Sequence, residues 1–225
     1  MPAAVVALAA ATASADTVDM KFVGTGAGRG VRVYFDGANH NLFAGQLNHR
    51  IVNSSGPDAP GVGNLTTYCI DIWESVNGGV RTFEVVDIDE APISPSRPTL
   101  NGAQADALGR LFTFSNRRHE LNNRSYNAAF QIALWEIMID LQQEGDDLDA
   151  EAGLFRASNL TSSTRTHLAS MLDAAGDGDV AIATNLTALA ALGVQDQVYQ
   201  VIIPLPTTAG LAAVGLAAVG LRRRR

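Results

Sequence analysis

Hydrophobic and polar residues alternate along the first half of the chain and again near its C-terminal end, as is typical of β-strands. The pattern predicts strands over residues 31–35, 42–52, 65–73, 81–88 and 197–203. The first two strands flank Asp36-Gly37, a dipeptide that favours a tight turn, so they are expected to form an antiparallel hairpin.

Between the fourth and fifth of these strands the spacing of apolar residues lengthens to that of helices. Helices are predicted over residues 103–114, 125–143 and 164–175. Ser125 is expected to cap the start of the middle helix, and Gly176 to follow the end of the third. The middle helix is expected to be amphipathic, with a buried stripe made by Ala128, Ile132, Trp135 and Ile139. We therefore expect an α+β fold: a single β-sandwich or barrel-like domain with an inserted helical subdomain.

The N-terminal segment is a short apolar run that ends in Ala13-Ser14-Ala15. This ending matches the small-residue cleavage site of a secretory signal peptide. Residues 1–15 are therefore expected to be removed on export, so that the mature chain starts at Asp16. The alternative is that the run is an ordinary hydrophobic segment of the fold.

The C-terminal segment has three parts, a proline motif, an apolar run and a basic cluster. The motif is Pro204-Leu205-Pro206, and the cluster is Arg222, Arg223, Arg224 and Arg225. A helix over the apolar residues 207–221 would be about 22 Å long, short of the roughly 30 Å hydrocarbon core of a bilayer. The layout resembles the PEP-CTERM sorting signals of bacteria, with leucine in place of the central glutamate. The resemblance implies recognition by an exosortase, transient anchoring in the membrane and delivery to the cell surface.

Composition fits one globular domain over residues 16–203, between the signal peptide and a sorting tail at residues 204–225. The chain has 225 residues, of which 47% are hydrophobic and 17% charged. All 23 acidic residues but only 12 of the 16 basic ones precede the terminal arginines, so this part has a formal charge of −11. Such a charge argues against a nucleic-acid partner, because phosphate recognition needs a basic surface. The sequence contains no phosphate-loop, zinc or nucleotide motif, so neither a cofactor nor a metal is expected.

The chain's only cysteine, Cys69, is a candidate nucleophile. In a strand, Cys69, Asp71 and Trp73 would point to one face of the sheet. Gln131 lies four residues before Trp135 on the middle helix, so its carboxamide and the indole share one side. A glutamine beside a buried stripe needs a hydrogen-bond partner. Each of these residues, taken alone, also fits plain core packing.

Two short motifs resemble those of bacterial thioester domains of the TQxA type. In that family a Tyr/Phe/Leu-Cys-hydrophobic-polar motif lies on a strand and a Thr-Gln-x-Ala-Ile/Val-Trp motif lies on a helix. The corresponding segments here are Tyr68-Cys69-Ile70-Asp71 and Phe130-Gln131-Ile132-Ala133-Leu134-Trp135, where Phe130 and Leu134 depart from the pattern. The resemblance covers most of residues 31–206. It implies an internal thioester between Cys69 and Gln131 that captures an amine-bearing molecule.

This chemistry needs the thiol and the carboxamide to be held in contact, because an amide is a poor electrophile. Asp71 is the nearest acidic group in sequence and is expected to orient the reacting groups. Trp73 and Trp135 are expected to keep water away from the bond.

The leading hypothesis is thus an exported surface protein that uses its thioester once and is not a turnover enzyme. Its expected partners are the sorting enzyme, an amine on another surface, and the membrane through the tail. One alternative is a non-reactive structural or matrix protein outside the cell. The other is a cysteine hydrolase, which would pair Cys69 with one of the four histidines, His40, His49, His119 and His167.

Overall fold

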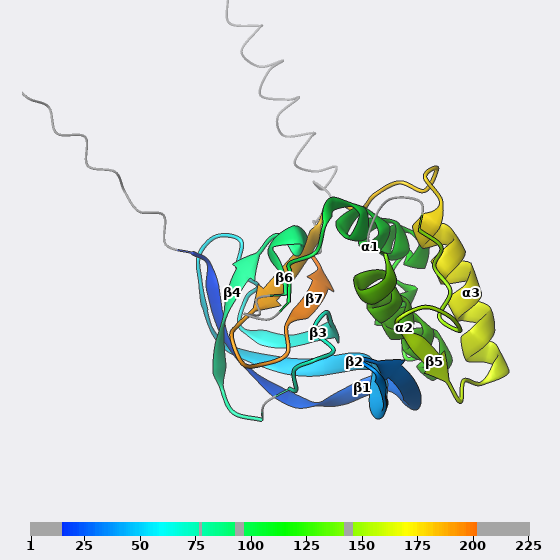
Figure 1. The fold of residues 1–225 in the computed structure, drawn as a ribbon. Coiled ribbons are helices and arrows are strands. Elements are labelled where there is room, and N and C mark those ends of the chain that lie inside the picture. The colour runs from blue at the N-terminus through cyan, green and yellow to red at the C-terminus, as the bar shows by residue number, and fades with distance from the viewer. Residues whose placement is uncertain (1–14, 77, 93–96, 142–145, 202–225) are drawn as a thin grey trace, which may run out of the picture.

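The computed structural model describes residues 15–76, 78–92, 97–141 and 146–201. Figure 1 shows most of the strands on one side of the molecule and the three helices on the other, with β5 beside the helices. The strands are β1 Thr17–Phe35, β2 Ala38–Ser55, β3 Gly63–Cys69, β4 Arg81–Val86, β5 Arg156–Ser158, β6 Leu186–Ala190 and β7 Gln197–Gln200. The helices are α1 Gly102–Ser115, α2 Arg124–Asp140 and α3 Ser162–Gly176, together with the short 3-10 helices η1 Ile88–Glu90 and η2 Arg118–Glu120.

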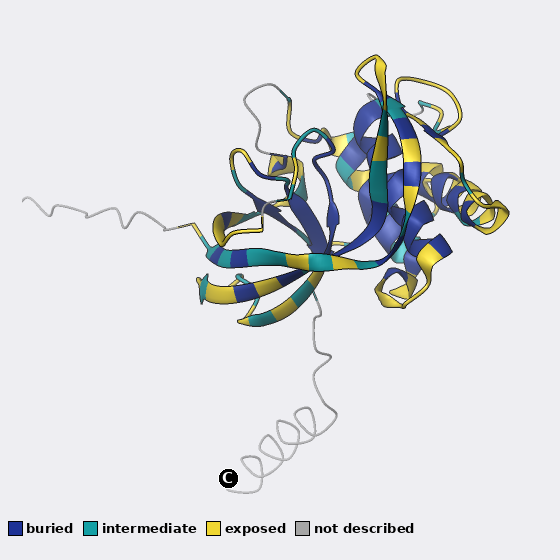
Figure 2. Cartoon of the chain, turned by 90° about the horizontal axis from the view of Figure 1, so that it is seen from below, coloured by how far each residue is buried: buried dark blue, intermediate teal, exposed yellow. Residues whose placement is uncertain are grey.

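Six of the strands form a closed ring of antiparallel pairs. The sheet order is β2-β3-β7-β6-β4-β1-β5, and β1 also pairs with β2, which joins the two sides of the ring. Inside the ring lies a small apolar cluster that includes Met20, Ile51, Phe83 and Tyr199. Exposed and buried residues alternate along the long strands, as Figure 2 shows, because one face of each strand packs and the other meets solvent.

The hairpin of β1 and β2 extends beyond the ring and reaches the helices. Its two strands stay paired from Thr17 and Ser55 to the turn at Asp36-Gly37, through three register shifts. Gly45 lies at the bend with φ +147°, and a Cβ there would clash with the Ala27 carbonyl oxygen, so glycine is required. The extended half of the hairpin places Val33 in the main core, against α2.

Helix α2 is the centre of that core. Every residue from Ser125 to Ile139 is buried, because the sheet covers one side of the helix and α1 and α3 cover the others. The expectation of an amphipathic helix with one buried stripe is therefore wrong. A helix enclosed on all sides has no solvent face to mark with polar residues.

The α+β class is confirmed, with the helices inserted between strands of one antiparallel sheet. The predicted helices agree with α1, α2 and α3 to within three residues at each end. Two predicted caps are wrong: the Asn123 side chain caps α2, and Gly176 is the last residue of α3. The predicted strand over residues 65–73 stops at Cys69. The sequence pattern missed β5, β6 and residues 17–30 of β1.

Among the described residues, no helix is both long enough and apolar enough to cross a membrane. The expected tail, with Pro204, Leu205, Pro206 and the arginines 222–225, lies outside the described residues, as do residues 1–14 of the expected signal peptide.

Two acidic side chains of α2 hold the loop that leads to β5. Glu136, which is only 1% exposed, accepts a hydrogen bond from the backbone N–H of Asp149 at 2.8 Å. Asp140 accepts from the backbone N–H groups of Leu154 and Phe155. Burial raises the pKa of Glu136 to about 8, and the nearby charge of Asp140 adds to that effect. Glu136 is therefore protonated in the folded protein at neutral pH.

The titration of Glu136 predicts how stability changes with pH. The folded-state pKa is about 8, above the ordinary value of 4.5, so this group's contribution is complete below about pH 4.5. This contribution is lost progressively as the pH rises from about 4.5 to about 8, with a slope of up to about 1.4 kcal/mol per pH unit. Glu136→Gln keeps the shape and an acceptor for Asp149 but cannot ionise. We expect the free energy of unfolding to fall less steeply from pH 5 to 8 in this variant, measured by urea denaturation. Parallel curves for the two proteins would contradict the assignment.

Candidate functional site

Cys69 is the last residue of β3. At this point β3 no longer pairs with β2 but does pair with β7. On one side the pairing with β2 ends two residues before Cys69, at Leu47 and Thr67. On the other side Cys69 lies opposite Gln197 of β7. Its side chain is 2% exposed. The thiol therefore lies in the core between the sheet and the helices.

Gln131 of α2 contacts Cys69 directly. The backbone N–H of Cys69 donates to Oε1 of Gln131 at 2.9 Å, and Nε2 of Gln131 donates to the Cys69 carbonyl oxygen at 2.8 Å. The carboxamide thus pairs with β3 as a strand residue would, where β2 has stopped. Gln131 is 1% exposed, so these bonds form away from solvent.

One turn earlier on α2, Asn127 fixes the register between the helix and the strand. The hydroxyl of Tyr68 lies 2.9 Å from Oδ1 of Asn127 and 2.7 Å from the carbonyl oxygen of His119. The amide nitrogen of Asn127 donates to the Leu121 carbonyl oxygen at 2.7 Å. Asn127 and Gln131, four residues apart, therefore hold consecutive residues of β3 from one face of α2.

The sulfur of Cys69 receives two N–H donors. The indole Nε1 of Trp135 lies 3.4 Å from Sγ, and the backbone N–H of Asp71 also points to it. Burial raises the pKa of the Cys69 thiol to about 12, while both donors favour the thiolate and oppose that rise. The neighbouring charges of Asp71 and Asp196 raise the pKa further. At neutral pH the resting group is a neutral thiol.

Asp71 bonds the Cys69 sulfur through its backbone N–H, whereas its carboxylate acts on the thiol only through its charge, which raises the pKa of Cys69. The sequence pattern predicted that Asp71 and Trp73 continue the strand face of Cys69. The strand instead ends at Cys69, so they do not. The carboxylate instead accepts the backbone N–H of Trp73 at 3.1 Å and caps the turn that follows. Burial raises the pKa of Asp71, and the hydrogen bonds of this turn oppose the rise.

Trp73 lies apart from Cys69 and Gln131. Its ring meets the edge of Phe35 at 6.3 Å and is covered by the guanidinium of Arg97 at 4.3 Å. The side chain is half-buried and lines a cavity of about 270 Å3, while no described contact joins it to Cys69 or Gln131. Of the two tryptophans, only Trp135 contacts the thiol in the described structure.

The four histidines offer Cys69 no base in the described contacts. His119 stacks on Phe130 and bonds Ser115, and burial lowers its pKa to about 4. His49 points into the ring, where Nδ1 lies 3.2 Å from the Thr67 hydroxyl. Of the other two, His40 packs against Phe35 and His167 packs against Tyr126.

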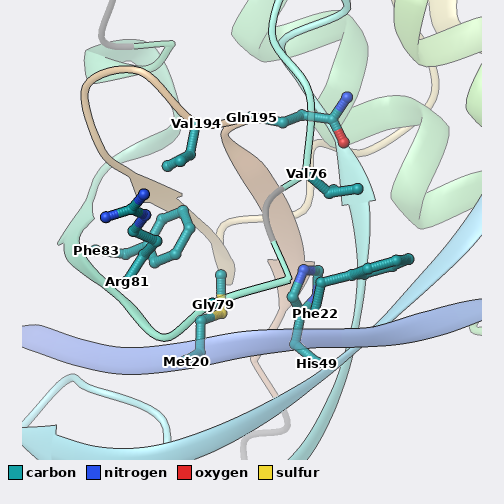
Figure 3. A pocket seen from close by; sticks show the side chains of 9 residues that line it. All are labelled: Met20, Phe22, His49, Val76, Gly79, Arg81, Phe83, Val194 and Gln195. Atoms are coloured by element: carbon teal, nitrogen blue, oxygen red, sulfur yellow. The ribbon is translucent and has the colours of Figure 1, made fainter.

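A small cavity lies beside His49, between the ring strands and the loops that carry Val76 and Val194. Figure 3 shows its walls, with the rings of Phe22 and His49 close together. Its volume of about 10 Å3 is that of roughly one water molecule. Neither Cys69 nor Gln131 lines it. It is too small for an organic substrate.

Sequence reasoning found Cys69, Gln131 and Trp135 but missed Asn127 and Tyr68 as the side chains that align them. A usable signal was present: Asn127 precedes Gln131 by one helical turn within an apolar run. Two carboxamides at that spacing on a buried helix indicate a shared polar partner.

Comparison of the chain with protein-family models, with curated proteins and with solved structures finds no match.

The pairing of Gln131 with Cys69 predicts a stability cost that does not depend on any covalent bond. In a Cys69→Ala background no thioester forms, and Gln131→Met removes both hydrogen bonds while keeping a side chain of similar length. The buried N–H and C=O of residue 69 then lack partners, at about 1–3 kcal/mol each. We expect the free energy of unfolding to fall by at least about 2 kcal/mol in denaturant titrations. An unchanged value would mean that the two bonds contribute nothing to folding.

Proposed function

We propose that this chain is a single-use covalent binding protein, in which Sγ of Cys69 and the carboxamide carbon of Gln131 form an internal thioester. The observation that carries the proposal is the pair of hydrogen bonds between the Gln131 carboxamide and the Cys69 backbone. They hold the electrophile against the residue that bears the nucleophile. Such positioning supplies several kcal/mol toward a reaction that free amides and thiols do not undergo at useful rates.

The bond-forming step is an acyl transfer. Sγ of Cys69 attacks the side-chain carbonyl carbon of Gln131, the C–N bond breaks, and the thiol proton leaves with Nε2 as ammonia. Negative charge develops on Oε1 during the attack. The backbone N–H of Cys69 already donates to that oxygen, so it serves as an oxyanion donor that needs no rearrangement.

The surroundings of the sulfur suit a slow, protected reaction. A pKa of about 12 leaves little thiolate at neutral pH, so positioning must replace intrinsic reactivity. Trp135 donates to Sγ and thereby favours the thiolate that attacks. Burial of Cys69, Gln131 and Trp135 limits hydrolysis of the product.

In the capture of a target, the sulfur of Cys69 changes from the attacking group to the leaving group. A neutral amine attacks the Gln131 acyl carbon, the C–S bond breaks, and the amine proton passes to the departing sulfur of Cys69. The product is an amide between Gln131 and the target plus a free thiol. A thiolate leaves far more readily than an amide nitrogen, so the cross-link is stable and the chain acts once.

The proposed setting is the outside of a bacterial cell. Residues 1–15 would direct export, and the Pro-Leu-Pro tail with its arginines would hold the chain in the membrane until an exosortase-type enzyme acts. The mature domain would then meet amines on another cell, a matrix or a host surface. The support for this setting is the sequence pattern at the two ends.

A second candidate is a non-reactive structural protein outside the cell. Two observations favour it: the Cys69 thiol is neutral and buried, and the Gln131 bonds also satisfy the Cys69 backbone in a purely structural role. The hydrolase alternative has no such support, because no described histidine bonds Cys69. Intact mass separates the first two candidates.

The thioester predicts a mass deficit of one ammonia in the freshly purified chain, together with a thiol that does not titrate. Methylamine should restore mass by adding to Gln131 and should release one titratable thiol at Cys69. Intact-mass spectrometry with thiol titration measures both. Cys69→Ala and Gln131→Ala should each abolish the deficit, and Gln131→Ala should leave a free thiol.

Full sequence mass in the wild-type chain, with a thiol that titrates once the chain is unfolded, would defeat the thioester and favour the structural candidate. Repeated consumption of a small ester by the same chain would instead favour the hydrolase.

The two tryptophans give a matched pair of variants. Trp135→Phe keeps an aromatic ring but removes the N–H donor to Sγ, so we expect a severalfold smaller fraction of chains with the mass deficit. Trp73→Phe is the control, because Nε1 of Trp73 has no hydrogen-bond partner among the described residues. It should match the wild type in the same mass measurement. Equal loss in both variants would refute the role of the Trp135 donor.

A further inference from the structure

The ring has an open seam between β3 and β7, at the end away from Cys69. The two strands pair at only two positions, Tyr68 with Val198 and Cys69 with Gln197. Continued in the same register, the ladder would set Thr66 against Gln200, but the strands diverge before that pair. Along the edges that face away from the seam both strands remain paired, β3 with β2 and β7 with β6.

The direction of the unpaired backbone groups follows from the pairs that form. The N–H of Ile70 donates to the Asp196 carbonyl oxygen, so even-numbered residues of β3 face β7. The N–H and C=O groups of Asn64 and Thr66 therefore face the seam, while the intervening Leu65 pairs with β2. By the same alternation the backbone of Gln200 faces the seam from β7, because the N–H of Val201 already donates to Asn185.

A groove occupies the seam. A cavity of about 850 Å3 at the mouth of the ring and one of about 270 Å3 on the outer side share four wall residues, Asn64, Leu65, Tyr199 and Gln200. Both cavities therefore border the stretch where β3 and β7 are not paired. Oε1 of Gln200 is buried in this wall and has no hydrogen-bond partner among the described residues. The groove thus borders unpaired strand edges, and its wall holds a buried acceptor without a partner among the described residues.

The chemistry of the walls selects an occupant. The larger cavity is lined by four acidic residues, Asp16, Asp58, Asp87 and Glu90, and by no basic residue of the described chain. Apolar surface lies between the acids, from Ile51, Leu65 and Val85. A segment that alternates basic and apolar residues complements both features when it is extended, because its side chains then point to opposite faces.

We propose that this seam is a peptide-binding site, in which a short extended segment of alternating basic and apolar residues pairs with the free edge of β3 at Asn64 and Thr66. Main-chain hydrogen bonds give such strand addition its affinity, and the side-chain walls give it selectivity. The site does not depend on the proposed thioester, since it uses the other end of β3. It gives the protein a reversible contact with a basic protein segment.

The test uses the full-length chain and a fluorescent octapeptide of alternating lysine and valine, with binding followed by anisotropy. The wild-type chain should bind this peptide, and binding should weaken at least tenfold when glutamate replaces lysine. Two further peptides carry N-methyl groups on all valines or on all lysines. Each removes the N–H donors along one edge of the strand, so only one of the two should lose at least tenfold in affinity.

Thr66 provides the matched variants. Thr66→Pro removes the N–H that faces the seam and leaves the β2 pairing partners intact, whereas Thr66→Ala keeps that N–H. Both lose the Thr66 hydroxyl bond to Asn48. We expect at least tenfold weaker binding in Thr66→Pro and less than twofold change in Thr66→Ala.

Equal affinities for both Thr66 variants, or for both N-methylated peptides, would reduce the contact to non-specific charge attraction and overturn the proposal. Failure of the wild-type chain to bind the lysine-valine peptide would also overturn it. If Thr66→Pro does not fold, as judged by circular dichroism, the two N-methylated peptides still decide the question on the wild-type chain. Mass and thiol measurements on the same samples report on the thioester separately.

Discussion

The two hydrogen bonds between the Gln131 carboxamide and the Cys69 backbone join the helices to the ring of strands. They lie where β2 stops pairing with β3, so without them a buried N–H and a buried C=O would have no partner. Burying unpaired backbone groups costs enough to decide between packings. This constraint helps to set the position of α2 over the sheet, and one turn away Asn127 adds a second link, a hydrogen bond accepted from the side-chain hydroxyl of Tyr68.

That constraint also acts on the two residues of the proposed thioester. Gln131 bonds the backbone of Cys69, and Trp135, four residues later on α2, bonds its sulfur, so one face of the helix contacts both parts of this residue. The proposed thioester uses the same Cys69 N–H that now holds Oε1 in place. The high pKa of Cys69 shows the cost of this arrangement, because the burial that protects a thioester also keeps the thiol neutral.

The two ends of β3 have opposite characters. At Cys69 every neighbouring backbone group is matched, by β7 on one side and by Gln131 on the other. At Asn64 the strand has lost β7, and its edge borders an acidic groove. One short strand thus carries a closed, dry site and an open, polar one. The proposed covalent attachment and the proposed peptide contact therefore share no residue of β3.

The sequence by itself determined the elements whose signals are local. The Asp36-Gly37 turn, the three helices and the buried glutamine beside Trp135 all follow from spacing within a few residues. Tertiary structure alone decided which groups meet. The closing of the ring depends on pairs distant in sequence, and the end of β3 at Cys69 turned Trp73 away from the thiol. The full enclosure of α2, and with it the burial of Glu136, came from packing on every side, which periodicity along one helix does not encode.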